Sequence, residues 1–67
     1  MTRRWSPSRR DLEILGLLAE GFTVDRISRR LEVSERTVRR RLRAMADDIG
    51  VDSTIELVVH AVRRQAI

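Results

Sequence analysis

The segment from Ser34 to Ile49 constrains the fold of this chain more than any other part of it. At about 100° per residue, four of its arginines fall on one face of a helix: Arg36, Arg39, Arg40 and Arg43. An apolar stripe lies on the opposite face and consists of Val38, Leu42, Met45 and Ile49. Because a core takes up the apolar face of such a helix, we expect the arginines to be exposed to solvent.

The positive charge of the chain is concentrated in the same segment. The chain has 14 basic residues, all of them arginine, and 10 acidic residues, so its net charge is +4. Residues 34–43 hold five arginines and one glutamate, and this stretch alone therefore carries a charge of +4. A net charge gathered on one short element is typical of a surface that binds nucleic acid. Like charges one helical turn apart repel by about 0.2–0.5 kcal/mol per pair, and DNA phosphates would relieve that repulsion.

Length and composition indicate one small domain. We expect the 67 residues to form a single domain over residues 1–67, with its core over about residues 7–64. The absence of cysteine excludes disulfides and thiolate metal sites and fits an intracellular compartment. We find no signal-peptide pattern and no apolar run near the roughly 20 residues of a membrane span. The expected location is the cytoplasm, in association with the nucleoid.

Capping and turn residues divide the chain into four helices and no strands, which predicts an all-α fold. Ser8 and Asp11 have the spacing of a capping box at the start of the first helix. Gly21 is expected to end that helix in a left-handed conformation. Thr23 and Ser34 carry the hydroxyl groups that would cap the second and third helices.

The last helix is expected to begin at a second capping box, Ser53 to Glu56. We expect one set of its apolar residues to pack into the core: Ile55, Val58, Val59 and Val62. Leu57 and Ala61 would then point outward. On a domain this small, an outward apolar face favours a symmetric dimer contact. At the other end of the chain, Trp5 is expected to fold back over the core.

The second and third helices are expected to be joined by a tight turn at Glu32 and Val33. Helices of about eight and fourteen residues, the second one basic, fit the helix-turn-helix plan. In that plan the first helix of the pair crosses the DNA backbone and the second enters the major groove. The sequence therefore predicts a double-stranded DNA-binding module whose recognition helix spans about residues 35–48.

Four short motifs occur in order along the chain: Leu15–Gly21, Ile27–Leu31, Val33–Val38 and Ile49–Val51. As an ordered set they resemble the LuxR/FixJ-type (GerE-like) DNA-binding domain of bacterial transcription regulators, and the resemblance covers about residues 7–64. It implies a four-helix domain that binds DNA as a homodimer paired through the last helix. A two-fold symmetric protein of this kind would read an inverted repeat. RNA polymerase is a further expected partner.

The resemblance also implies roles for individual residues. Base contacts map onto Arg39, Arg40 and Arg43. Contacts to the DNA backbone map onto Thr23, Ser34, Arg36, Thr37 and Arg41. The dimer contact falls to Leu57 and Ala61 on the last helix. The chain departs from the family at Arg26, where the family often has an acid. Arg3 and Arg4 are expected to belong to a frayed terminus, with an arm that reaches the DNA minor groove or backbone as the alternative.

Two other functions fit parts of the sequence. The promoter-reading fourth region of a sigma factor has a related helix-turn-helix but would bind as a monomer. A small interaction module could instead dock its basic helix in an acidic protein groove. We expect no enzyme, because the only histidine, His60, has no carboxylate pair beside it and there is no cysteine. No metal or cofactor is predicted.

Overall fold

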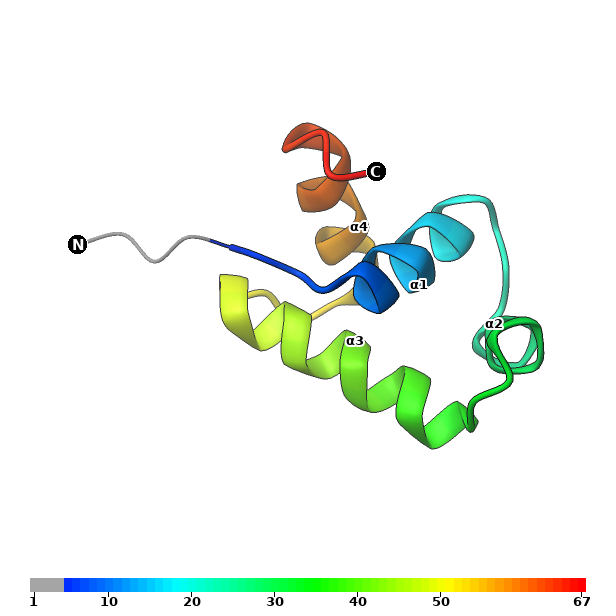
Figure 1. Cartoon of the computed structure of the whole chain (residues 1–67). Helices are drawn as coiled ribbons and strands as arrows, with labels where there is room; N and C mark the ends of the chain where they lie inside the picture. Colours follow the sequence, from blue (N-terminus) through cyan, green and yellow to red (C-terminus); the bar gives the residue numbers. More distant parts are fainter. Residues whose placement is uncertain (1–4) are drawn as a thin grey trace.

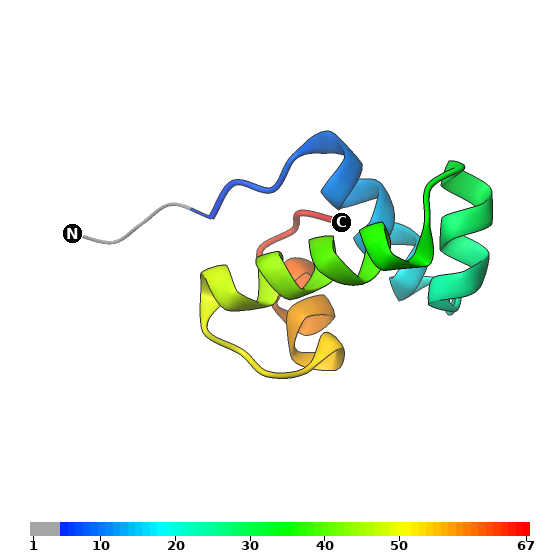
Figure 2. The ribbon, with the colours of Figure 1, turned by 90° about the horizontal axis from the view of Figure 1, so that it is seen from below.

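The computed structural model describes residues 5–67, so Arg3 and Arg4 lie outside the described residues. Over this range the chain forms four helices and no strand, as predicted (Figure 1). The helices are α1 (Arg9–Ala19), α2 (Val24–Leu31), α3 (Glu35–Ile49) and α4 (Thr54–Arg63). Helix α3 runs along one side of the molecule, and α1, α2 and α4 pack against its other side (Figures 1 and 2).

Each helix begins at a residue whose hydroxyl group accepts a hydrogen bond from a backbone N–H of the first turn. The capping residues are the predicted ones: Ser8, Thr23, Ser34 and Ser53. A cap of this kind stabilises a helix by about 1 kcal/mol. The first capping box is complete, because the Ser8 amide also donates to the Asp11 carboxylate at 3.2 Å. The second is only half formed, since Glu56 accepts from the Asp52 amide instead.

Left-handed residues end the first three helices. Gly21 (φ 97°) follows α1 and Gly50 (φ 74°) follows α3, and glycine adopts this conformation without strain. Glu32 (φ 58°) takes the same conformation after α2, although it has a side chain. These three residues fix the directions in which the chain leaves each helix.

The core lies between α1, α3 and α4, and Ile27 of α2 closes one end of it. Its buried members are Ile14, Leu15, Ile27, Val38, Leu42, Met45, Leu57 and Ala61. The apolar stripe of α3 is therefore inside, as predicted, with Ile49 only partly buried. Trp5 packs on this core in an edge-to-face arrangement with His60, and the two ring centroids are 4.7 Å apart.

The orientation predicted for α4 was wrong, although Val58 packs against the core as predicted. Leu57 and Ala61 are fully buried, whereas Ile55 is 76% exposed and Val62 is 52% exposed. Helix α4 is apolar on more than one face, so its own periodicity does not select the buried one. The turn at Gly50, followed by Val51 packing against the core, sets the direction from which α4 approaches. Leu57 and Ala61 therefore cannot form a dimer surface.

A buried carboxylate joins α1 to α3. Asp11 is only 2% exposed, and Arg41 donates to its two oxygens from Nε at 2.7 Å and from Nη2 at 2.6 Å. These hydrogen bonds lower the pKa of Asp11 below its usual 3.8, against the opposing effect of burial, and the Ser8 amide adds to the lowering. The local sequence pattern predicts only the capping role of Asp11, because its second partner lies 30 positions along the chain.

We predict that Asp11→Asn destabilises the fold by about 1–3 kcal/mol at neutral pH, because it leaves the Arg41 guanidinium without its paired carboxylate. Since the pKa of Asp11 is lowered in the folded state, its contribution exists above the unfolded-state pKa and is lost as pH falls through the lowered value. The difference in the free energy of unfolding between wild type and variant should therefore stay constant from about pH 7 to about pH 5 and shrink below about pH 4, as the pH falls through the lowered pKa of Asp11. Urea unfolding followed by circular dichroism at several pH values measures this difference in the free energy of unfolding.

Glu13→Gln is the matched control for this experiment. Glu13 also pairs with an arginine, Arg10, but at 3.8 Å and with both side chains about half exposed. Removing the charge of Glu13 should change the free energy of unfolding by less than about 0.5 kcal/mol. Equal effects of the two substitutions at neutral pH would contradict the special role of Asp11.

Candidate nucleic-acid interface

The exposed face of α3 carries the arginines that the sequence placed there. Arg36, Arg39, Arg40 and Arg43 are all exposed. Figure 2 looks at this side of the molecule, with α3 running across it from the end beside α2 to the end that leads into the loop before α4. Because the opposite face of α3 is held in the core, these guanidinium groups can reach a ligand without any change of fold.

The four arginines differ in their partners. Arg39 pairs with Glu35 at 3.0 Å and Arg43 with Asp47 at 3.5 Å, each one turn along α3. Within residues 5–67, Arg36 and Arg40 form no ion pair with an acid. Exposed pairs of this type stabilise by only about 0.2–1 kcal/mol, so a ligand can displace the acid from Arg39 and Arg43. Arg36 and Arg40 are available without that step.

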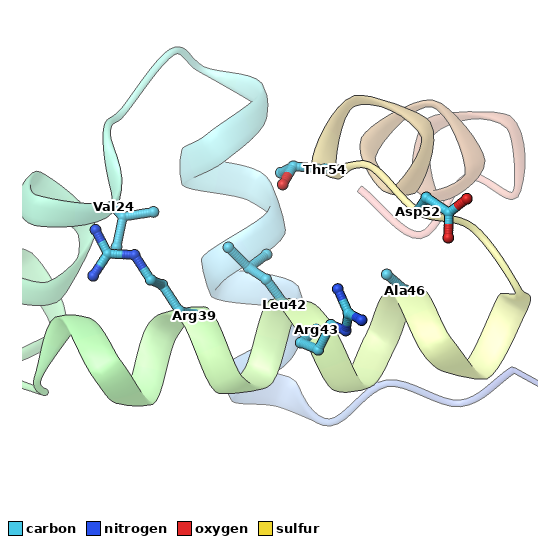
Figure 3. Close-up of a pocket in the computed structure, with 7 residues that line it drawn as sticks. All are labelled: Val24, Arg39, Leu42, Arg43, Ala46, Asp52 and Thr54. Carbon is cyan, nitrogen blue, oxygen red and sulfur yellow. The ribbon is translucent and has the colours of Figure 1, made fainter.

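A groove lies along one edge of this face, between the starts of α2 and α4 (Figure 3). Arg39 extends toward Val24 at the start of α2. Leu42 and Ala46 of α3 also line the groove, with Arg43, Asp52 and Thr54 toward α4. Arg39 and Arg43 therefore border the groove, while Arg36 and Arg40 do not line it.

Hydroxyl groups surround the N-terminal end of α3. The Ser34 hydroxyl accepts from the Thr37 amide at 3.0 Å and donates to the Thr37 hydroxyl oxygen at 2.9 Å. The Thr37 side chain is exposed and keeps its own O–H as a donor. Thr23 is also exposed, and its hydroxyl accepts from the Arg26 amide at 3.2 Å. These groups and the helix N-termini beside them suit an anionic ligand.

Arg41 lies apart from the other arginines of α3. Its hydrogen bonds to Asp11 raise its pKa, and they use the Nε proton and one proton of Nη2. A guanidinium has five N–H groups, so three are not used in this pair. With 43% of the side chain exposed, Arg41 can present those three to solvent. Asp11 thereby fixes the orientation of a cation at the edge of the arginine face.

A second exposed surface is apolar and lies on α4. Ile55, Val59 and Val62 have the spacing of a single helical face and are 76%, 44% and 52% exposed. A shallow groove beside them is also lined by Leu18 of α1 and Val58. The outward apolar face predicted at Leu57 and Ala61 lies instead at these three residues. The sequence shows apolar residues at i, i+4 and i+7 here, but it does not show which apolar face of α4 is exposed.

Among residues 5–67, no helix combines the length and the apolar character that crossing a membrane requires.

Known proteins share this arrangement. The family model described as "Bacterial regulatory proteins, luxR family" (GerE) matches residues 6–61. No curated protein is a significant match in sequence. The crystal structure of the response regulator ChrA, from a heme-sensing two-component system, is similar with a TM-score of 0.88 and 29% identity. The match covers 98% of the present chain and 33% of that regulator, so this chain spans about a third of its length.

Proposed function

The chain belongs to the luxR family of bacterial regulatory proteins, and from this membership we propose that it reads a specific double-stranded DNA sequence with α3 in the major groove. The family consists of DNA-binding transcription regulators. The observation that carries the more specific proposal is the exposed arginine face of α3, opposite a buried apolar stripe. The major groove of B-DNA is about 12 Å wide and admits one α-helix.

Arg39, Arg40 and Arg43 are the proposed base-reading residues. A guanidinium donates two parallel hydrogen bonds to the O6 and N7 atoms of guanine, which discriminates against other bases by about 1–3 kcal/mol. Arg40 is exposed and forms no ion pair among the described residues, so it needs no rearrangement. Arg39 and Arg43 would first leave Glu35 and Asp47.

The proposed backbone contacts lie around this centre. Arg36 supplies a cation that forms no ion pair with an acid within residues 5–67, and the Thr37 hydroxyl supplies a donor. Thr23 and Ser34 bring the N-termini of α2 and α3 to phosphate groups. Arg41 would contact a phosphate through the N–H groups that Asp11 leaves unused. Contacts of this kind position the protein on the duplex but carry no sequence information directly.

We predict different effects for two neighbouring arginines. Arg40→Ala should weaken binding to a selected, guanine-containing site by about 5- to 100-fold and change non-specific binding much less. Arg36→Ala should weaken both kinds of binding by a similar factor and reduce the slope of log K against log salt by about one. Fluorescence anisotropy with labelled duplexes at several salt concentrations measures both quantities.

Arg63→Ala is the control, because Arg63 is an exposed arginine at the end of α4 and away from α3. It should leave specific binding nearly unchanged. Identical behaviour of Arg40→Ala and Arg36→Ala would contradict the proposed division between base and phosphate contacts. A loss as large in Arg63→Ala would show that only total charge matters.

We further propose that two copies pair through α4 and read an inverted repeat. The support is the apolar face of Ile55, Val59 and Val62, which water would otherwise cover. Burying apolar area contributes about 25 cal/mol per Å², and a 67-residue domain has a small core of its own. As a transcription regulator, the dimer would act beside RNA polymerase on promoter DNA in the bacterial cytoplasm.

The double variant Ile55→Ser/Val59→Ser should weaken binding to an inverted repeat by about ten-fold or more and leave binding to a single half-site unchanged. Sedimentation of the protein–DNA complexes should show two protomers per repeat for wild type and one for the variant. Ala19→Ser, at an exposed position of α1, is the control and should not change the stoichiometry. Wild type that binds only as a monomer would contradict pairing and favour a sigma-like mode of promoter reading.

A further inference from the structure

A cluster of arginines surrounds Phe22 on the outer side of α2. The guanidinium of Arg26 lies 4.5 Å from the centroid of the Phe22 ring, and that of Arg30 lies 5.7 Å from it. Arg29 completes the wall of a shallow hollow at this place. We name Phe22, Arg26, Arg29 and Arg30 the α2 arginine cluster. None of these four residues is used in the DNA contacts proposed above.

The α2 arginine cluster faces away from α3. Val24 of α2 lines the groove against α3, and at about 100° per residue Arg26 lies about 160° around the helix from Val24. Figures 1 and 2 show α2 at one end of the molecule, beside the start of α3, with its outer side open to solvent. A duplex bound to the exposed face of α3 would therefore leave this cluster accessible.

The charges of the cluster are only partly balanced. Arg29 pairs with Asp25 at 2.8 Å, but Arg26 and Arg30 form no ion pair with an acid within residues 5–67. These two arginines are one turn apart, a spacing at which like charges repel. The ring of Phe22 attracts both guanidinium groups and restrains their positions. Less side-chain freedom is then lost when a ligand binds.

The chemistry of the cluster fits a protein partner. Arginine and aromatic residues are enriched at the centres of protein interfaces. A guanidinium donates two parallel hydrogen bonds to one carboxylate. Two such groups one turn apart match two acidic side chains one turn apart on a facing helix. We propose that the α2 arginine cluster is a docking surface for an acidic helical segment of another protein and that it is used while α3 is on DNA.

A synthetic helical peptide with pairs of glutamates one turn apart is a suitable probe, and its glutamine counterpart is the control. Fluorescein-labelled peptide is titrated with the full chain already saturated by duplex DNA. The glutamate peptide should bind and the glutamine peptide should not. Arg26→Gln/Arg30→Gln should weaken peptide binding about ten-fold and change DNA affinity less than about two-fold. Phe22→Leu, which keeps an apolar side chain, should weaken peptide binding by about two- to five-fold.

The matched control removes the same charge elsewhere. Arg63→Gln/Arg64→Gln, at the exposed end of α4, should change peptide affinity less than about two-fold. Equal losses in the two double variants would overturn the proposal, because total charge would then explain binding. A loss of DNA affinity in Arg26→Gln/Arg30→Gln would also overturn it and assign the cluster to DNA phosphates. Arg40→Ala separates the two proposals, since it should weaken DNA binding while peptide binding to the DNA-free chain persists.

Discussion

The ion pair between Asp11 and Arg41 is the contact on which the placement of α3 depends. The apolar stripe of α3 determines which face turns inward, but apolar contacts tolerate small shifts along and around a helix. Two short hydrogen bonds between a buried carboxylate and a planar guanidinium allow far less movement. They fix the middle of α3 against the first turn of α1, where Asp11 is itself held by the Ser8 amide. The direction of the arginine face follows from this register.

The fold was largely predictable because its signals are local. Hydroxyl residues start all four helices, and Gly21 and Gly50 mark two of the ends, so the boundaries follow from residues a few positions apart. The two faces of α3 follow from one period, since the apolar stripe and four of the five arginines separate on it. For the same reason, the exposure of Arg36, Arg39, Arg40 and Arg43 was correctly predicted. Their contacts with DNA remain predictions.

The parts that sequence reasoning missed depend on contacts between distant segments. Arg41 pairs with a residue 30 positions away, and no pattern near either residue indicates the pairing. Helix α4 is apolar on several faces, so only the path of the chain after Gly50 decides that Leu57 is inside and Ile55 outside. The α2 arginine cluster needs Phe22, which precedes the helix, to lie beneath Arg26 and Arg30. In the first two cases the missing information is the relative placement of two elements, and in the third it is the direction of the Phe22 ring just before α2.

The central claim is that α3 reads base sequence and does more than attract phosphate. Selection of binding sites from a library of random duplex DNA, followed by affinity measurements at two salt concentrations, tests it most directly. The account predicts an enriched palindromic motif that contains guanine, bound with a steep dependence on salt because several arginines contact phosphates. Salt-sensitive binding with no enriched motif would contradict it and leave only a cationic surface.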